Sequence, residues 1–333
     1  MKAAVIGAGY WGPNLIRNFL AQDDVESVVA CDLDESRLAR MRKSFYGIET
    51  ALDANEVIDR SDTDLVVIAT PVSTHFELAK RAVSQGKHCW LEKPLTASVA
   101  EADELCEIAE KNNATLFVDH TFVYTGAVRK MKEVIDSGRL GEIYYFDSVR
   151  VNLGLFQHDV NVIWDLAPHD LSIADYLLDS KPVSVSAVGS CHVGNGLEDI
   201  AYLTLQYDNN LIAHFHVNWL APVKIRKTVI GGSRSMIVYD DTETSEKIKI
   251  YDKGIDVTTR EGVYDTLVQY RTGDMLSPKL DQTEALTTAT AHFIDCVKNG
   301  TKPDTDGHAG LNVVRILEAS GESIKGGGKA IAI

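Results

Sequence analysis

Short apolar runs alternate with helical patterns through the first third of the chain. The runs at residues 3–6, 25–30, 64–69, 88–91 and 115–118 predict strands. Helix-opening patterns lie between them, of which Thr74-x-x-Glu77 and Ser98-x-x-Glu101 have the spacing of capping boxes. This alternation is typical of an α/β domain in which a parallel sheet carries helices on both faces. We place this domain at residues 1–121.

The pattern changes after about His120. A helix is expected over residues 127–136. Strand-like segments then follow at 142–151, 183–192, 200–207, 211–219, 226–231, 236–240 and 247–251. Turn residues separate neighbouring segments, as at Asp208-Asn209-Asn210, which indicates antiparallel pairing.

One helix, over 164–178, interrupts this series, and two more, over 282–298 and 308–324, close the chain. We therefore predict an α+β domain over residues 122–333 with a large, mostly antiparallel open-faced sheet. A sheet with one uncovered face suits self-association, so a homodimer or homotetramer through this sheet is expected.

Composition and charge narrow the class of protein. A chain of 333 residues suits two domains, and its apolar runs are too short to span a membrane. The formal charge of −15 argues against partners such as nucleic acid or an anionic membrane surface. The 5 cysteines are scattered and form no CxxC pair, which is typical of reduced thiols in a cytoplasmic protein.

A glycine-rich turn follows the first predicted strand and opens a helix. Its residues are Gly7-Ala8-Gly9-Tyr10-Trp11-Gly12, a GxGxxG pattern in the strand–turn–helix context of a dinucleotide site. Gly7 permits the turn, Gly9 leaves room for the phosphates, and Gly12 lets the helix approach the strand. The first domain is therefore predicted to be a Rossmann domain, with these loop residues contacting the cofactor.

Asp32 lies 20 residues beyond Gly12, at the end of the second predicted strand. A carboxylate there accepts hydrogen bonds from the adenosine ribose and repels a 2′-phosphate. The predicted cofactor is therefore NAD. The alternative is a helix-capping turn followed by a solvated aspartate.

Two further segments end predicted strands on the side where such sheets bind ligands, Thr70-Pro71 and Glu92-Lys93-Pro94. A lysine directed into the cofactor cleft would hold a substrate hydroxyl or stabilise a developing oxyanion. From position alone, Lys93 is equally consistent with a surface lysine in a loop.

The segment Trp164-Asp165-Leu166-Ala167-Pro168-His169-Asp170 is the other candidate for chemistry. Asp165 and His169 are four residues apart and share one helix face. Because proline fits best in a first helical turn, Asp165 is expected near the N-cap. There the helix dipole favours neutral imidazole at His169, and a neutral histidine beside a carboxylate can act as a general base. A capping aspartate with a packed histidine explains the same spacing.

Arg150 and Asn152 share one face of a predicted strand and are candidates to bind polar substrate groups, although both residue types often face solvent. His214 and His216 also share a strand face, but no third ligand has matching spacing, so no metal site is predicted. The sequence lacks a GxSxG elbow, an HExxH motif and a GKS or GKT phosphate loop. Hydrolase and kinase chemistry therefore has no support.

Together, the glycine loop, Glu92-Lys93-Pro94 and Asp165-x-x-x-His169 resemble the glucose–fructose oxidoreductase/inositol dehydrogenase (Gfo/Idh/MocA) family. Ala69-Thr70-Pro71 with His75 downstream also resembles that family's pattern. The resemblance implies that the lysine lies between nicotinamide and substrate, that the Lys93–Pro94 bond is cis, and that Asp165 and His169 border the reacting carbon. It adds Thr70, Pro71, His75, Glu92 and Lys93 to the residues expected around NAD.

Residues 9–14 and 164–170 are similar to members that oxidise nucleotide sugars for polysaccharide synthesis, such as UDP-N-acetylglucosamine 3-dehydrogenases. The resemblance implies an NAD-dependent dehydrogenase acting on a secondary alcohol of a sugar ring. His169 would take the hydroxyl proton, Asp165 would orient it, and Lys93 would stabilise the alkoxide. A dehydrogenase of a free sugar or inositol, and a catalytically silent NAD-sensing regulator, are the alternatives.

Overall fold

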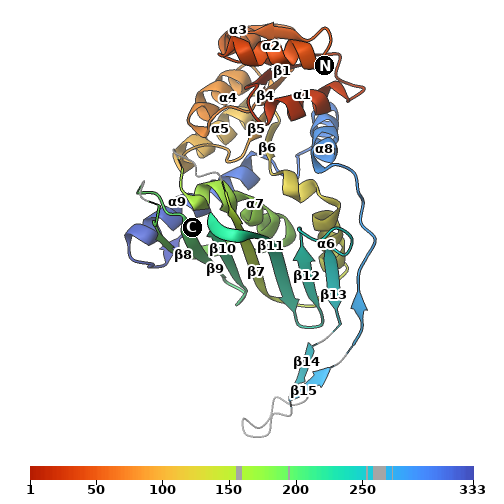
Figure 1. Ribbon diagram of the computed structural model, residues 1–333, viewed down its shortest axis with the longest axis vertical. Coiled ribbons are helices and arrows are strands. Elements are labelled where there is room, and N and C mark those ends of the chain that lie inside the picture. Colours follow the sequence, from red (N-terminus) through yellow and green to blue (C-terminus); the bar gives the residue numbers. More distant parts are fainter. Residues whose placement is uncertain (155–159, 194–195, 253, 258–267, 272) are drawn as a thin grey trace. The chain divides into compact units, whose positions relative to one another are not determined.

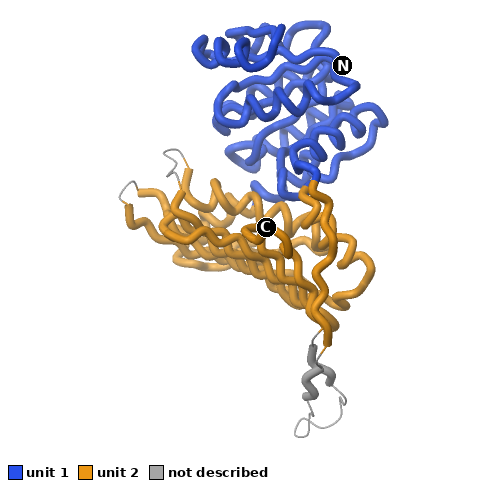
Figure 2. Tube along the Cα trace, turned by 45° about the vertical axis from the view of Figure 1, so that its right-hand side comes forward, with its two compact units in different colours: residues 1–124, 283–315 blue, residues 125–282, 316–333 orange. Residues whose placement is uncertain are grey.

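The computed structural model describes residues 1–154, 160–193, 196–252, 254–257, 268–271 and 273–333, and these form two compact units (Figures 1 and 2). Residues 1–124 and 283–315 make the first unit, and residues 125–282 and 316–333 make the second. The sequence-based division assigned every residue after 121 to the second domain. In the structure residues 283–315 belong to the first unit instead.

The first unit is built on a parallel sheet of six strands among its described residues, in the order β3-β2-β1-β4-β5-β6. The strands are β1 (Lys2–Ile6), β2 (Ser27–Cys31), β3 (Glu49–Ala51), β4 (Leu65–Ile68), β5 (His88–Glu92) and β6 (Leu116–Asp119). All four residues of β4 are buried, as expected of a central strand covered on both faces. This order is the Rossmann order: strands are added from β1 outward to β3 on one side and from β4 outward to β6 on the other, which leaves a crevice at the carboxyl ends of β1 and β4. The predicted fold class is confirmed, although β3 was not predicted.

Helices cover this sheet on both faces (Figure 1). They are α1 (Gly12–Leu20), α2 (Glu35–Ser44), α3 (Ala54–Asp59), α4 (His75–Ser84), α5 (Val99–Lys111) and α8 (Ala285–Asn299), with short 3-10 segments η1 (Val72–Thr74) and η2 (Thr121–Tyr124). Ser98 caps α5 by accepting from the Glu101 amide, as predicted. Thr74 makes no side-chain cap to α4; its hydroxyl donates to Pro71 O and lies 2.7 Å from Thr70 Oγ1.

Phe293 explains why α8 belongs to the first unit. Its ring centroid lies 6.2 Å from that of Phe19, 5.7 Å from that of Trp90 and 5.4 Å from that of Phe117. All four rings are fully buried. Aromatic contacts at these separations stabilise the fold beyond the burial of apolar area. α8 therefore completes the core of a unit whose sheet lies more than 150 residues earlier in the chain.

The second unit contains one large sheet, of nine strands in its described part, in the order β16-β13-β12-β11-β7-β10-β9-β8-β17. The strands are β7 (Ile143–Leu153), β8 (Pro182–Ser190), β9 (Ile200–Tyr207), β10 (Ile212–Asn218), β11 (Leu220–Gly232), β12 (Met236–Asp240), β13 (Ile248–Tyr251), β16 (Met275–Leu276) and β17 (Ile331–Ala332). Only the β7–β10 pair is parallel among these, because α7, β8 and β9 lie between the two strands in the chain. The short strands β14 (Gly254–Val257) and β15 (Val268–Arg271) pair separately. The predicted mostly antiparallel sheet is confirmed.

The helices α6 (Gly126–Asp136) and α7 (Val162–Leu177) belong to this unit, and α9 (Gly307–Lys325) is divided between the units. α7 packs on β7, β9 and β10. Alternate residues on this side of the strands are buried, such as Phe146 on β7 and Phe215 on β10. On the opposite face the side chains are partly exposed, as for Val149, His216 and Val229. The sheet therefore has one helix-covered face and one uncovered face.

Candidate active site

The loop between β1 and α1 has a shape that requires glycine at two positions. Gly7 has φ +100°, and a Cβ there would lie 2.5 Å from Ala69 O. A Cβ on Gly12 would lie 2.2 Å from Gly7 O. At Gly9, by contrast, a Cβ would meet only Arg37 Nη1, at 3.8 Å, so the loop is open where a pyrophosphate would approach.

α1 begins at this loop without a side-chain cap. Its N-cap is Trp11, which makes no capping hydrogen bond, and Pro13 occupies the first turn. No side chain therefore covers this helix N-terminus, where the helix dipole favours an anion. Tyr10 and Trp11 are exposed and pack edge to face, with ring centroids 5.8 Å apart.

Asp32 follows β2 and is 8% exposed. Its Oδ2 accepts from the Ala8 amide at 2.8 Å, and its Oδ1 accepts from the Asp34 amide at 2.9 Å. Arg37 Nη1 lies 3.3 Å from Asp32 Oδ2. The carboxylate is thus fixed against the glycine loop, beside an arginine that no sequence motif indicated.

A pocket of about 1060 Å³ opens on this edge of the sheet. Its lining includes Gly7, Gly9, Asp32, Thr70 and Pro71 among the predicted cofactor residues. A nucleotide fits this volume and this combination of an open glycine loop, a helix N-terminus and a carboxylate. The residues present therefore suit the adenosine and pyrophosphate parts of NAD.

His75 does not line this pocket. Its side chain is 1% exposed, with Nδ1 3.0 Å from Pro94 O and Nε2 2.9 Å from Thr70 O. Burial lowers the pKa of this imidazole, while the two carbonyl groups raise it. His75 was expected to contact the cofactor, but in the structure it has a structural role. Its two hydrogen bonds join the end of β4 to the loop after β5.

Lys93 directly follows β5, and the Lys93–Pro94 peptide bond is cis, as the resemblance implied. Lys93 is partly buried. Two acids lie beside it, Glu92 at the end of β5 and Asp119 at the end of β6, and these positions are register partners in the sheet. Sequence reasoning named Glu92 but missed Asp119, whose only signal was its position at the end of a predicted strand.

Asp165 and His169 lie on α7, but not where the proline rule placed them. The N-cap is Asn161, whose Oδ1 accepts from the Trp164 amide at 3.1 Å. Pro168 therefore lies inside the helix, and Asp165 is in the first turn, four residues after the N-cap. Trp219 Nε1 donates to Asp165 Oδ2 at 3.0 Å, so a buried indole orients this carboxylate.

Arg150 is not available to a substrate. It is 3% exposed, and its Nε and Nη2 each donate to a carboxylate oxygen of Asp170 at 2.8 Å. Burial opposes the charge of the guanidinium, but nearby carboxylates, Asp170 foremost, outweigh burial and raise its pKa. The prediction that Arg150 binds substrate is therefore replaced by a structural pairing of β7 with α7. Asn152, two residues further along β7, remains partly exposed.

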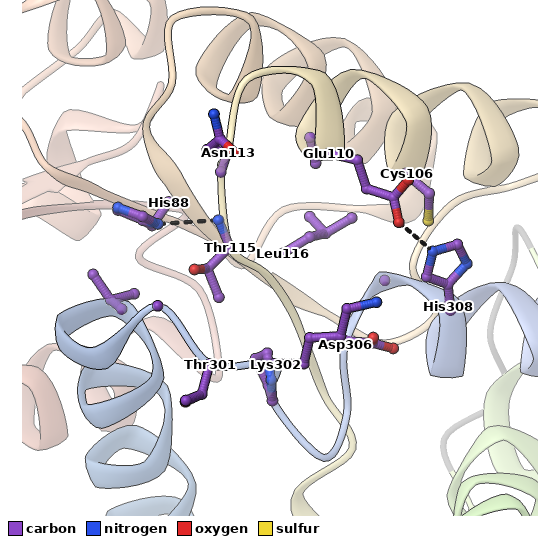
Figure 3. A pocket seen from close by; sticks show the side chains of 16 residues that line it. His88, Cys106, Glu110, Asn113, Thr115, Leu116, Thr301, Lys302, Asp306 and His308 are labelled. Atoms are coloured by element: carbon purple, nitrogen blue, oxygen red, sulfur yellow. Dashed lines mark hydrogen bonds and ion pairs between the residues drawn. The ribbon is translucent and has the colours of Figure 1, made fainter.

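A second, smaller pocket lies at the opposite ends of the strands in the first unit (Figure 3). His88, Thr115 and Leu116 at the starts of β5 and β6 line it, together with Lys302 and His308. His88 Nδ1 accepts from the Thr115 amide at 3.0 Å, and burial lowers the pKa of His88. Ligands of doubly wound sheets bind at the carboxyl ends of the strands, so this pocket is not the cofactor site.

Metal-binding clusters and membrane-spanning helices are both absent from the described residues. These residues contain no group of three or more histidine, cysteine or acidic side chains arranged to hold a metal ion. No helix in the described ranges is long and apolar enough to cross a membrane.

Comparison with known proteins agrees with this architecture. Residues 1–120 match the family model described as an oxidoreductase family with an NAD-binding Rossmann fold, and residues 128–238 match the GFO/IDH/MocA C-terminal domain. Myo-inositol 2-dehydrogenase of Thermotoga maritima is 25% identical over 98% of this chain and 96% of that protein.

UDP-N-acetylglucosamine 3-dehydrogenase of Acidithiobacillus ferrooxidans is 29% identical over 64% of this chain and 66% of that protein. Its solved structure superposes with a TM-score of 0.79 at 23% identity, covering 98% of each chain. A levoglucosan dehydrogenase solved with NADH and levoglucosan superposes with a TM-score of 0.85 at 19% identity, covering 100% of this chain and 99% of that one. These likenesses establish a shared fold and leave the substrate of this chain open.

Proposed function

Because the chain belongs to the Gfo/Idh/MocA family of NAD-binding oxidoreductases, we propose that it oxidises a ring hydroxyl of a nucleotide sugar, with C3 of UDP-N-acetylglucosamine as the first candidate. Dehydrogenation of a sugar or polyol CH–OH group with NAD is common to the family. The nucleotide sugar is the finer proposal. The observation that carries it is the likeness to the Acidithiobacillus enzyme, which exceeds the likeness to the inositol dehydrogenase in identity over a shorter alignment.

NAD held at the glycine loop and Asp32 would supply the hydride acceptor for this oxidation. In the proposed mechanism His169 takes the hydroxyl proton as the C–H bond breaks. Asp165, itself held by Trp219 Nε1, orients the imidazole from one helical turn away. Lys93 stabilises the developing alkoxide with its ammonium group. The hydride and the proton together account for the two hydrogens lost by the alcohol.

A nucleotide diphosphate is an anion, and a chain of formal charge −15 repels it unless cations lie at the site. Three basic residues around the middle of β11, Lys224, Arg226 and Lys227, are the candidates in the second unit. Arg226 already pairs with Asp241, at 3.3 Å, and Lys227 is the register partner of Val149 on the uncovered face of the sheet. Lys224, whose side chain is exposed, is therefore the better candidate for a phosphate contact.

The test is NADH absorbance with a panel of UDP-, GDP- and dTDP-sugars beside glucose and inositol. UDP-N-acetylglucosamine or its uronate should support turnover, and KM should rise with salt, because ions screen the attraction of a diphosphate. Free polyols should be poor substrates, since they lack the anchor that positions the ring.

Turnover confined to glucose or inositol would refute the nucleotide-sugar proposal and favour the free-polyol dehydrogenase. Tight, stoichiometric NADH binding without turnover on any member of the panel would favour an NAD-sensing regulator. The presence of Lys93 and His169 argues against that last alternative, because a sensor needs neither an oxyanion stabiliser nor a general base.

The uncovered face of the large sheet supports a further part of the proposal, a homodimer or homotetramer through this face. Partly exposed apolar side chains, such as Val149 on β7 and Val229 on β11, lie on it. Val229→Glu should shift the sedimentation coefficient of the purified protein toward that of a monomer. Tyr46→Glu, on a fully exposed residue of the first unit, is the control and should leave the oligomer intact.

A further inference from the structure

Two carboxyl groups meet behind Lys93 in the first unit. Glu92 ends β5 and Asp119 ends β6, and the sheet pairs these two positions directly. Register partners on parallel strands direct their side chains to the same face of the sheet. Glu92 and Asp119 therefore lie at neighbouring positions on one face of the sheet, the arrangement in which two carboxyl groups share a hydrogen bond.

Such a hydrogen bond requires a proton. Ionised carboxylates have acceptors only, so one of the two groups must carry a hydrogen to donate. The surroundings favour retention of that proton, because Asp119 is 2% exposed and Glu92 Oε1 is buried without a partner among the described residues. Thr121 Oγ1 donates to Asp119 Oδ1 at 2.7 Å, which favours Asp119 as the ionised member.

Lys93 is a charged neighbour of this pair in the first unit, and its positive charge lowers the pKa of both acids. His120, the residue after Asp119, is 1% exposed, and its ring nitrogens have no partner in the described ranges. Burial, together with the charge of Lys93, lowers the pKa of His120 to about 3, so the imidazole is neutral and supplies no charge.

We propose that Glu92 and Asp119 share one proton and so place a single negative charge beside Lys93 at neutral pH. Neither acid touches the substrate in this proposal. They are positioning residues that act through Lys93, since one carboxylate supplies a counter-charge to its ammonium group. Two carboxylates would be too costly at this buried position.

Titration of the pair supports this interpretation. Burial raises the pKa of Glu92 well above its usual range, and the neighbouring Asp119 raises it further. Burial also raises the pKa of Asp119, to about 6, against the effects of Thr121, Glu92 and Lys93. Both shifts favour retention of one proton by the pair, with Glu92 as the protonated member.

Infrared spectroscopy of the purified protein tests the shared proton without any substrate. Wild-type protein in D₂O at pH 7 should show the carbonyl-stretch band of a protonated carboxyl group, and Glu92→Gln should remove it. Glu107→Gln, at an exposed glutamate of α5, is the matched control and should leave the band in place. Absence of the band in the wild type, or its persistence in Glu92→Gln, would overturn the proposal.

The chemical reactivity of Lys93 tests whether the Glu92–Asp119 pair carries a negative charge. Only the unprotonated amine reacts with an acylating reagent, and its rate can be followed by mass spectrometry of the Lys93 peptide. Glu92→Gln keeps the Asp119 charge and should leave this rate near that of the wild type. The double variant Glu92→Gln/Asp119→Asn should raise it several-fold, and equal rates in the two variants would count against the proposal.

The role assigned to Lys93 rests on the proposed function, but the two measurements above do not. If the infrared band and the lysine reactivity behave as expected while no sugar or nucleotide sugar is oxidised, the pair stands and the proposed function fails. Turnover of a nucleotide sugar by a protein that lacks the band would instead support the proposed function and refute the shared proton.

Discussion

Asp32 is paired with a cation that bears on cofactor choice. Arg37 Nη1 lies 3.3 Å from its carboxylate, and the side chain of Arg37 is 44% exposed. Rossmann proteins that bind NADP use an arginine in this region for the 2′-phosphate, whereas an acid favours NAD. At this site both are present. We propose that Asp32 determines the choice, because it pairs with the arginine and repels the phosphate.

Asp32→Ser should therefore reduce NAD preference in two ways. We expect kcat/KM for NAD to fall by about tenfold, as a charged hydrogen bond to ribose is lost, while that for NADP rises because Arg37 is released. In the double variant Asp32→Ser/Arg37→Ala, kcat/KM for NAD should remain low, and the rise in kcat/KM for NADP should disappear. Equal kcat/KM for both cofactors in the wild type would refute the role of Asp32.

Lys93→Met and His169→Ala should each lower kcat by about 10²-fold or more, because they remove groups that act on the transition state. The dissociation constant for NADH, measured by fluorescence, should change little. Asp165→Asn should be milder, because the amide can still accept from Trp219 Nε1. Near-normal kcat in His169→Ala would move the role of base elsewhere, with Lys93 tested first.

The residues that sequence reasoning placed well are those whose role depends on the local backbone. Gly7 and Gly12 follow from the strand–turn–helix pattern. In the structure an added Cβ at either position would clash with neighbouring backbone, which is why glycine is needed there. Arg150 and His75 were misplaced because their partners are not local. Nothing in the strand around Arg150 indicates that Asp170 will lie opposite it, and nothing near His75 indicates the Pro94 carbonyl.

At the scale of elements, the N-cap residue and the proline of α7 indicate different positions for the start of the helix. Asn161 starts the helix, and Pro168 lies within it. A proline in a helix interior removes the N–H that would bond the carbonyl four residues earlier. Sequence reasoning placed Pro168 in the first turn, which is wrong, although the helix start expected at residue 164 lies only two residues from the observed one. The side-chain cap and the apolar face against β7, β9 and β10 outweigh the cost of the proline.

The Arg150–Asp170 pair joins α7 to β7, and its removal should be costly. Arg150→Met leaves the Asp170 carboxylate buried without its main partner, for which about 3–5 kcal/mol of destabilisation is expected. Arg150→Met/Asp170→Leu should recover most of that loss in urea unfolding. In the double variant KM for the sugar substrate should be unchanged. A large rise in KM with normal stability would restore the role of Arg150 in substrate binding.

At the scale of the whole molecule, the order of elements along the chain does not give the membership of the domains. The periodicity of α8 predicts a helix with an apolar face but not the sheet that this face covers. Long-range contacts decide it, such as those of Phe293 with Trp90 and Phe19, which join residues about 200 or more positions apart. The two sheets, by contrast, were predictable because alternation and turn residues are local signals.

Phe293→Ala should therefore destabilise the nucleotide-binding unit although it lies near the end of the chain. Truncation of a fully buried phenylalanine costs about 3–5 kcal/mol. The midpoint of thermal unfolding should fall, and NADH should restore part of the loss, because it binds only the folded unit. Tyr46→Ala, at a fully exposed aromatic residue, should do neither. A Phe293→Ala protein of wild-type stability would contradict the assignment of α8.

The shared proton also predicts how stability varies with pH. The pKa of Asp119 is about 6 in the folded protein, above its ordinary value of 3.8, and that of Glu92 is raised as well. The folded state then binds more protons than the unfolded state at these groups. They stabilise the fold at low pH, and this contribution is lost as pH rises through the folded pKa values. Buried His120, with its pKa lowered to about 3, acts in the opposite direction over the same range.

Glu92→Gln/Asp119→Asn removes the two acids and leaves His120, so the unfolding midpoint of the variant should rise more steeply with pH than that of the wild type between pH 4 and about 6. The comparison is a difference between two proteins, in which the remaining titrating groups cancel. Thermal unfolding at pH 4, 5, 6 and 7, in buffers of equal ionic strength, measures it. Asp34→Asn is the control, because its carboxylate has a lowered pKa and contributes stability that is lost as pH falls. Parallel curves for the double variant and the wild type would mean that the two acids titrate alike in the folded and unfolded chains.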